Sequence, residues 1–285
     1  MAFVYDCAAV THIGRCRANH EDNFFIGKLL APQEQAALSQ SGRKCIQKSL
    51  SADNARNRIF AVSDGMGGHK NGEAASFLVA DALRRFACAD TGKAFRKRRD
   101  KFAYIQKFQD MVRKTNREML SCEEGEDEAE GMGATLSGVI LFADEIVPFN
   151  IGDSSVFLYA DGQLRKLTRD DNEAAWPGSS KTGALQAGRR LTKYFGLPES
   201  GGVLAAAFSA PIPLRGKQMI LAASDGLTDS LSPSDIAGVL ASCPGDAGRA
   251  AEALAQHALA AENGGRDNTT AAVLQVREKK QRRLL

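Results

Sequence analysis

The strongest constraint on this chain is an apolar run that ends in Ser-Asp-Gly, because the pattern occurs twice. Residues 59–62 are apolar and lead directly into Ser-Asp-Gly, with its carboxylate at Asp64. Residues 219–223 lead in the same way into a second Ser-Asp-Gly at Asp225. Each run predicts a buried strand, and the glycine that follows, such as Gly65, allows a sharp turn or a close backbone approach. Each strand is therefore expected to carry one carboxylate at its C-terminal end.

Three further places put acids at the ends of expected strands. Glu21 and Asp22 precede a short apolar segment, Asp153 lies in a hairpin turn, and Asp267 precedes the last strand. In an antiparallel sheet an arriving strand and its departing neighbour share one rim, so all five sites can lie together. An all-oxygen cluster suits hard divalent cations such as Mg²⁺ or Mn²⁺. Without cations, so many carboxylates in one place would repel each other.

The remaining pattern predicts an α+β fold. Many short apolar segments are joined by tight turns, as at Asp161-Gly162. Segments 72–86, 102–120 and 247–260 are expected to be helices, and Ser232-Pro-Ser-Asp is a helix start with Ser at the cap. We expect a central antiparallel β-sandwich flanked by helix pairs rather than alternating βαβ units.

One catalytic domain is expected over residues 1–276, followed by a basic tail at 277–285 that we expect to be frayed. Residues 171–202 are rich in Gly, Ser and Lys and predict a mobile surface flap. Residues 29–57 give no clear pattern and are expected to form an irregular excursion or a loose helix.

Composition excludes several classes of protein. The net charge of +3 is too small to indicate a nucleic-acid partner, and no apolar run reaches the length of a membrane span. The N-terminus lacks the pattern of a signal peptide. The six cysteines are scattered, without a Cys-x-x-Cys pair, which favours reduced thiols in a cytoplasmic protein over a zinc site or a disulfide framework.

Taken together, the motifs resemble those of the metal-dependent, type 2C Ser/Thr protein phosphatases, and the Asp-Gly-Met-Gly-Gly sequence resembles the bacterial branch. The resemblance extends from about residue 5 to 276. The motifs that carry it, in chain order, are Arg17-Ala-Asn-His-Glu-Asp22, Asp64-Gly-Met-Gly-Gly68, Gly133-Ala-Thr135, Gly152-Asp-Ser154, Ser224-Asp-Gly226 and Asp267-Asn268.

The resemblance implies two metal ions, Mn²⁺ or Mg²⁺, at one end of the sandwich. By position, Asp64 resembles the ligand that bridges both ions, and the carbonyl of Gly65 a ligand of the second ion. Asp225 and Asp267 resemble the other carboxylates of the first ion. Glu21 resembles a ligand of the second ion, directly or through water.

Three further roles follow from the same resemblance. Asp22 resembles an acid outside the metal ligands, and Arg17 the arginine that holds the phosphate. Asp153, together with Asp225, resembles the site of a third, weaker metal. The expected chemistry is direct attack on phosphorus by a hydroxide that bridges the two ions, because paired cations lower the pKa of a shared water. Arg17 then offsets charge on the phosphate oxygens, which its guanidinium fork fits.

Departures from the family pattern concern proton donation and local pairing. Met66 occupies the position where some members carry a histidine, and it cannot protonate a leaving alkoxide. His69 and His20 are each interpreted as polar loop residues. Ser155 replaces an arginine that often follows Gly-Asp-Ser and touches no expected ligand.

Two other functions are weighed against a phosphatase. A catalytically silent protein that binds phosphoproteins or a kinase is opposed by the presence of every expected metal ligand. A nucleotide-binding protein has only glycine richness in its favour, since no Gly-x4-Gly-Lys-Ser/Thr is present. The expected partners are phosphorylated protein substrates and a paired Ser/Thr kinase, with no nucleic acid and no membrane, and the expected state is a monomer.

Overall fold

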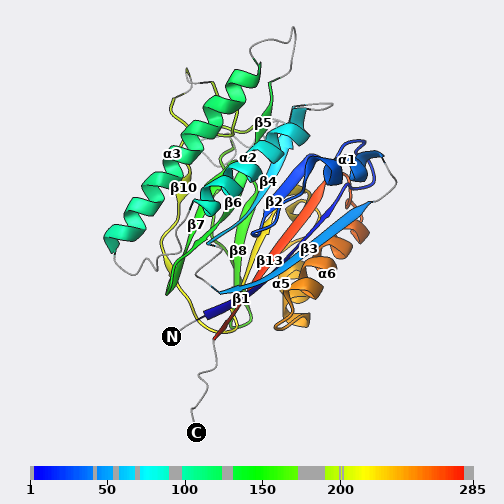
Figure 1. Ribbon diagram of the computed structural model, residues 1–285. Helices are drawn as coiled ribbons and strands as arrows, with labels where there is room; N and C mark the ends of the chain where they lie inside the picture. Colours follow the sequence, from blue (N-terminus) through cyan, green and yellow to red (C-terminus); the bar gives the residue numbers. More distant parts are fainter. Residues whose placement is uncertain are drawn as a thin grey trace, which may run out of the picture.

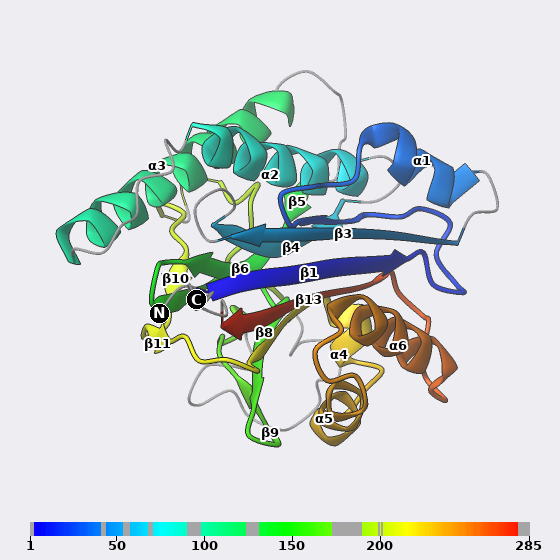
Figure 2. The same cartoon turned by 60° about the horizontal axis from the view of Figure 1, so that its bottom comes forward.

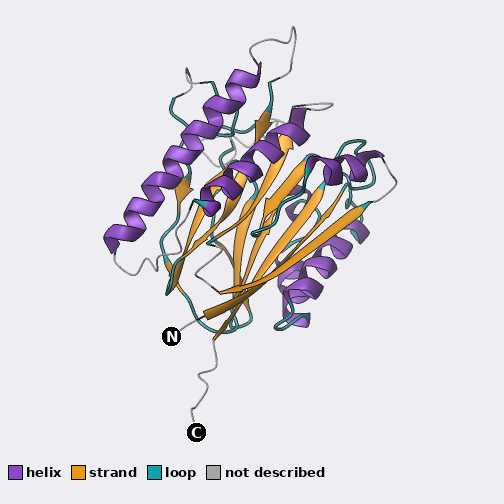
Figure 3. Cartoon of the chain, viewed as in Figure 1, coloured by secondary structure: helices purple, strands orange, loops and turns teal. Residues whose placement is uncertain are grey.

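Two antiparallel sheets pack face to face and carry helices on their outer surfaces (Figure 1, Figure 2). The computed structural model describes residues 3–40, 44–53, 58–67, 71–89, 98–123, 131–172, 190–198, 200 and 202–278. Figure 3 shows the strands gathered in the middle of the molecule and the helices at its periphery. The predicted α+β class and the antiparallel sandwich are confirmed.

The first sheet has six strands and contains both the first and the last strand of the chain. All its neighbouring strands are antiparallel. In spatial order they are β3 (Cys45–Asp53), β1 (Phe3–His12), β13 (Thr269–Glu278), β12 (Met219–Ala223), β8 (Ser155–Ala160) and β9 (Gln163–Lys166).

The second sheet is built around β4, the strand that carries Asp64. In spatial order its main path is β10 (Ala207–Phe208), β7 (Glu145–Ile151), β6 (Leu136–Leu141), β4 (Ile59–Met66) and β2 (Asp22–Phe25). Two short strands lie off this path: β11 (Ile212–Pro213) pairs with β7, and β5 (Gly133–Ala134) pairs with β4.

Helices cover the outer face of each sheet. The second sheet packs against α2 (Asn71–Cys88) and α3 (Arg98–Glu123), and the first against α4 (Asp225–Thr228), α5 (Pro233–Ser242) and α6 (Ala247–Ala260). The remaining helix, α1 (Pro32–Gln40), lies beside α2 and β3. The predicted helix start at Ser232 is confirmed: its side chain accepts from the backbone N–H of Asp235, in a capping box. None of the helices in the described residues combines the length and apolar character needed to cross a membrane.

The continuous apolar runs of β4 and β12 have a simple cause, because both strands are covered on both faces. In β4, Phe60 and Val62 face the core between the sheets, and Ile59 and Ala61 face α2 and α3. Alternate side chains of a strand point to opposite faces, so a strand between two cores is apolar at every position. Strand β12 divides in the same way between the inner core and the α4–α6 layer.

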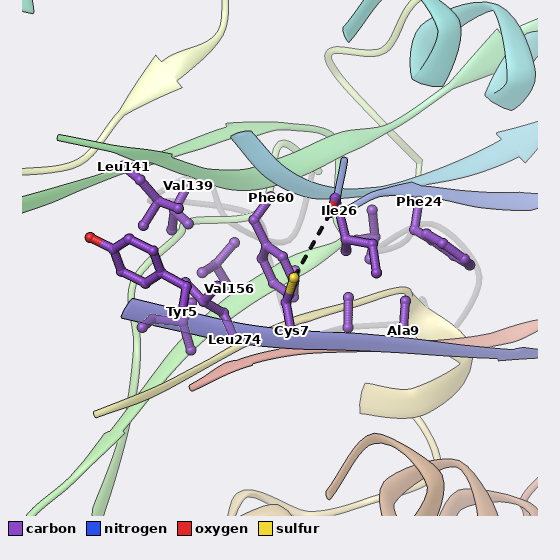
Figure 4. Close-up of a cluster of buried hydrophobic side chains, with 14 of the residues drawn as sticks. Tyr5, Cys7, Ala9, Phe24, Ile26, Phe60, Val139, Leu141, Val156 and Leu274 are labelled. Atoms are coloured by element: carbon purple, nitrogen blue, oxygen red, sulfur yellow. Dashed lines mark hydrogen bonds between the residues drawn. The ribbon is translucent and has the colours of Figure 1, made fainter. Parts of the chain in front are cut away.

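The core between the sheets is closely packed by large side chains (Figure 4). Tyr5, Phe60 and Leu274 are each about 1% exposed, and the Cys7 thiol lies 3.8 Å from the carbonyl oxygen of Ile26. Burying one such apolar side chain stabilises the fold by about 1.5–3 kcal/mol. This core fixes the relative position of the two sheets, and therefore of the loops at their ends.

The structure differs from the sequence-based expectations in residues 29–57. The loose helix is α1, but residues 45–53 form a regular strand that pairs with β1 along its whole length. This strand lies at the edge of its sheet, so only one of its neighbours is a strand. Its sequence therefore needs little apolar alternation, which is why the pattern did not reveal it.

Two other segments are only partly described. Arg277 and Glu278 belong to β13, and Arg277 forms an ion pair with Asp6, while residues 279–285 lie outside the described residues. Residues 173–189 of the expected flap also lie outside them. The returning part of the flap, 190–198, is not a free surface loop, because Phe195 is fully buried and exchanges two backbone hydrogen bonds with Ala134 (2.8 and 3.1 Å).

Candidate active site

A single cavity of about 580 Å³ collects the acids that the sequence placed at strand ends. Its lining includes Glu21, Asp64, Asp153, Asp225 and Asp267. Arg17 and Gly65 line the same cavity. Of the eight site residues expected from the sequence, seven therefore surround one space, and the eighth, Asp22, lies buried behind it.

The topology explains why residues so far apart in the sequence meet here. Asp22 and Asp64 lie directly opposite each other in the antiparallel pair β2–β4. Asp225 follows β12 as the first residue of α4, and Asp267 lies just before β13, the neighbour of β12. Asp153 lies in the turn between β7 and β8, which belong to different sheets. Both sheets thus contribute carboxylates to one end of the sandwich.

Asp22 is fully buried and held on one side only. Its Oδ2 accepts hydrogen bonds from the hydroxyls of Ser224 (2.8 Å) and Thr270 (2.6 Å), whereas its Oδ1 is a buried atom without a partner. Burial raises the pKa of Asp22 to about 7, against the opposing effect of the two hydroxyl donors.

The ionised forms of Asp64 and Asp225 are also unfavourable in this site. Burial raises the pKa of Asp64 well above its usual range, and repulsion from Asp22 and Asp225 raises it further. Burial, followed by repulsion from Asp153 and Asp267, raises the pKa of Asp225 to about 7. The Oδ1 of Asp225 is buried without a hydrogen-bond partner.

These observations fit the hard cations expected from the sequence. Buried carboxylate oxygens without donors, and neighbouring acids that repel one another, are what a divalent cation would satisfy. Within the described part of the chain, no group of three acidic, histidine or cysteine side chains is already arranged to hold a metal ion. The acids of the described residues line a common cavity but do not converge on one ready-made coordination position.

Arg17 extends into the cavity from the loop before β2 and is half-exposed. One of its terminal nitrogens lies 2.6 Å from Asp267 Oδ2, and this hydrogen bond raises the pKa of Arg17. The guanidinium fork has five N–H donors, so one bond to Asp267 leaves others available to an anion.

Glu21 is fixed by its backbone on two sides. Its N–H donates to Asn268 Oδ1 (2.7 Å), and its carbonyl accepts from the N–H of Gly65 (3.1 Å). Burial raises the pKa of its side chain. The glycines beside it are required by space: a Cβ at Gly65 would lie 2.0 Å from the carbonyl oxygen of Gly72, and a Cβ at Gly72 would lie 2.5 Å from Glu21 Cδ.

We expect Gly65→Ala to destabilise the protein severely. The added methyl group would overlap backbone atoms, which cannot move away as a flexible side chain could. Overpacking of this kind costs about 1–3 kcal/mol or more. The measurement is the midpoint of urea unfolding, with Gly238→Ala as the control. Gly238 lies in α5 with nothing within 4 Å of an added Cβ, so alanine there is expected to stabilise the helix. Equal midpoints for the two variants would contradict this account.

Several residues that shape the site were not assigned a role from the sequence. Thr135 accepts from the N–H of Asp64 (3.0 Å) and bonds to the Ser154 hydroxyl (2.7 Å). Arg190 and Tyr194, from the returning part of the flap, line the cavity. The motif Gly-Ala-Thr could have indicated Thr135, but no sequence pattern indicated the two flap residues.

His20 lies in the loop before β2, as expected, but its side chain is not on the surface. The His20 ring is fully buried, and its Nε2 lies 2.9 Å from the Thr11 hydroxyl. Burial lowers the pKa of His20 to about 3, so the ring is neutral. His69 lies outside the described residues, and Met66 lines the cavity.

Comparison with known proteins agrees with this geometry. The family model described as Protein phosphatase 2C matches residues 39–262. The serine/threonine phosphatase Stp of Listeria monocytogenes is 30% identical over 192 residues, which cover 65% of this chain and 72% of that protein.

Two solved structures of related proteins have the same fold. One is the catalytic domain of the serine/threonine protein phosphatase PstP in complex with two manganese ions, at 26% identity and a TM-score of 0.71, covering 97% of this chain and 100% of that one. The other is PstP/Ppp of Mycobacterium tuberculosis, at 25% identity and a TM-score of 0.71, covering 98% and 100%. The family suggested by the motifs is confirmed, and the chain belongs to the protein phosphatase 2C family.

Proposed function

We propose that this protein is a metal-dependent phosphatase that removes phosphate from phosphoserine and phosphothreonine in proteins. The observation that carries the proposal is the cavity that five carboxylates and Arg17 line together. The matched relatives are named serine/threonine phosphatases, which supports the proposal. We further propose that the protein is a monomer in the cytoplasm. Its substrates would be phosphorylated proteins, and it would act opposite a paired Ser/Thr kinase.

The acids of the cavity are proposed to hold two Mn²⁺ or Mg²⁺ ions. Asp64 would contact both, Asp225 and Asp267 the first, and the Gly65 carbonyl and Glu21 the second. A third, weaker ion is proposed beside Asp153. Bound there, such cations supply Lewis acidity toward phosphate oxygens and lower the pKa of water.

The chain's own groups then orient the phosphate. The N–H groups of Arg17 that do not bond to Asp267 are placed to donate to phosphate oxygens, and the Asp267 contact holds the guanidinium at the cavity. None of the described residues that line the cavity is a histidine, and Met66 carries no transferable proton. We propose that the leaving alkoxide takes its proton from water rather than from a histidine.

The direct test is phosphate release from a phosphothreonine peptide by the purified protein in Mn²⁺. Release is expected, and EDTA is expected to stop it. The alternative function, a silent phosphoprotein-binding protein, predicts a different result: calorimetry would show peptide binding, but no phosphate would appear. Binding without release would contradict the proposed catalysis.

We expect Arg17→Ala to lower kcat/KM about 30- to 300-fold, because the charge on the phosphate oxygens loses its guanidinium partner. Arg17→Lys should recover part of this loss, since it restores charge without the planar fork. Steady-state kinetics on the phosphopeptide measure both. The control is Arg113→Ala, which removes a surface arginine of α3 paired with Asp110. A rate for Arg17→Ala equal to that of the control would exclude the proposed role.

A further inference from the structure

A chain of hydrogen bonds runs through the interior behind the cavity and ends on Asp22. His20 Nε2 lies 2.9 Å from Thr11 Oγ1, Thr11 Oγ1 lies 2.6 Å from Thr270 Oγ1, and Thr270 Oγ1 lies 2.6 Å from Asp22 Oδ2. All four residues are fully buried. Thr11 and Thr270 are opposite each other in the β1–β13 pair, so the regular sheet register sets their contact.

The direction of this chain follows from counting protons. The hydroxyls of Thr270 and Ser224 both donate to Asp22 Oδ2. A threonine hydroxyl has a single proton, so Thr270 has none left and must accept from Thr11. Thr11 has then used its own proton and must accept from His20. With Oδ2 of Asp22 as an unprotonated acceptor, Nε2 of His20 is therefore protonated, whether Asp22 is ionised or carries a proton on Oδ1.

Backbone hydrogen bonds hold the residues at both ends of this chain, whereas the Nδ1 atom of His20 is buried without a partner. The backbone N–H of His20 donates to Ser39 Oγ (2.9 Å), which in turn donates to Glu73 in the first turn of α2 (3.0 Å). Ser224 Oγ accepts from the N–H of Thr270 (2.9 Å), and its own hydroxyl proton is donated to Asp22 Oδ2. The Oδ1 of Asp22 is left as a buried acceptor without a partner.

We propose that His20 is a positioning residue of the active site, which acts through Thr11 and Thr270 to orient Asp22. A donor relay with one direction holds both hydroxyl hydrogen bonds on Oδ2 and leaves Oδ1 as a buried acceptor without a partner, on the residue opposite Asp64 in the β2–β4 pair. The inference rests on the proposed metal site, because the role proposed for Oδ1 is to accept a hydrogen bond from water held by bound cations.

The test separates this role from simple packing by changing one hydroxyl. Thr11→Val has nearly the same shape and breaks the relay, whereas Thr11→Ser keeps it. Mutation of a residue that hydrogen-bonds to a metal ligand typically lowers metal affinity 10- to 100-fold. Thr11 is one step further from the proposed metal ions than such a residue. We expect Thr11→Val to weaken Mn²⁺ binding by about three- to tenfold in calorimetry with the metal alone. Thr11→Ser should recover the affinity of the unaltered protein.

The control for loss of a buried threonine hydroxyl is Thr115→Val in α3, outside the cavity lining. Its Mn²⁺ affinity should be unchanged. Equal affinities for Thr11→Val and Thr115→Val would overturn the proposal.

If Thr11→Val does not fold, nitrogen-15 NMR of the unaltered protein decides: protonated Nε2 on His20 is expected, and an unprotonated Nε2 would refute the relay. Neither readout needs turnover, so a protein that binds Mn²⁺ but releases no phosphate would contradict only the proposed function.

Discussion

Asp225→Asn is expected to lower kcat by about 10²–10³-fold with Mn²⁺ present. The residue lines the cavity at the end of β12, and its Oδ1 is buried without a donor. Asparagine fills nearly the same volume but carries no charge, so a cation held as proposed would lose one of its anionic ligands. Steady-state phosphate release at several Mn²⁺ concentrations measures the loss, which extra metal should restore only in part.

The same substitution should not destabilise the metal-free fold. Burial and repulsion from Asp153 and Asp267 raise the pKa of Asp225, so its charge is unfavourable there. A neutral amide relieves this repulsion, and Tm in EDTA at pH 8 should stay the same or rise. Asp161→Asn, at an exposed hairpin turn, is the control for activity. Full activity of Asp225→Asn would contradict the metal role, and an unfolded variant would contradict the electrostatic account.

Removal of divalent metal is expected to abolish activity and to make stability depend on pH. The pKa of Asp22 and of Asp225 is raised from 3.8 to about 7 in the folded state. Between pH 4 and 7 the folded protein therefore holds more protons at these residues than the unfolded chain does. Stability of the metal-free protein should fall as pH rises through this window.

Bound cations should reverse that loss, because they attract the ionised acids. An ion at about one hundred times its dissociation constant adds about 2.7 kcal/mol, or roughly 5 °C or more in Tm. The increase in Tm on adding Mn²⁺ should therefore be larger at pH 8 than at pH 5. Differential scanning calorimetry at the two pH values measures it. An equal increase at both, or activity that survives EDTA, would show that the acids do not hold the essential metal.

The sequence was most informative where one physical cause dominates the residue pattern. The apolar run before Asp64 exists because β4 is buried on both faces, and the same holds for β12 before Asp225. Each strand end then needs a glycine, since at Gly65 and Gly226 a Cβ would lie 2.0 Å from a backbone oxygen. Asp64 and Asp225 could therefore be located from the ends of these two strands alone.

The rest depends on contacts between distant segments, which leave no local pattern. Edge strand β3 lacks the alternation of a covered strand. The burial of His20 and its contact with Thr11 arise from the packing of β1, β13 and the loop before β2. The sequence around Phe195 predicts a surface flap, because its hydrogen-bond partner, Ala134, is remote in the sequence.

A crystal soaked in MnCl₂ and measured at the manganese absorption edge tests the central claim most directly. We expect two anomalous peaks inside the cavity, with Asp64 in contact with both and with Asp225 and Asp267 around one of them. Peaks elsewhere on the molecule, with none among these three carboxylates, would contradict the account.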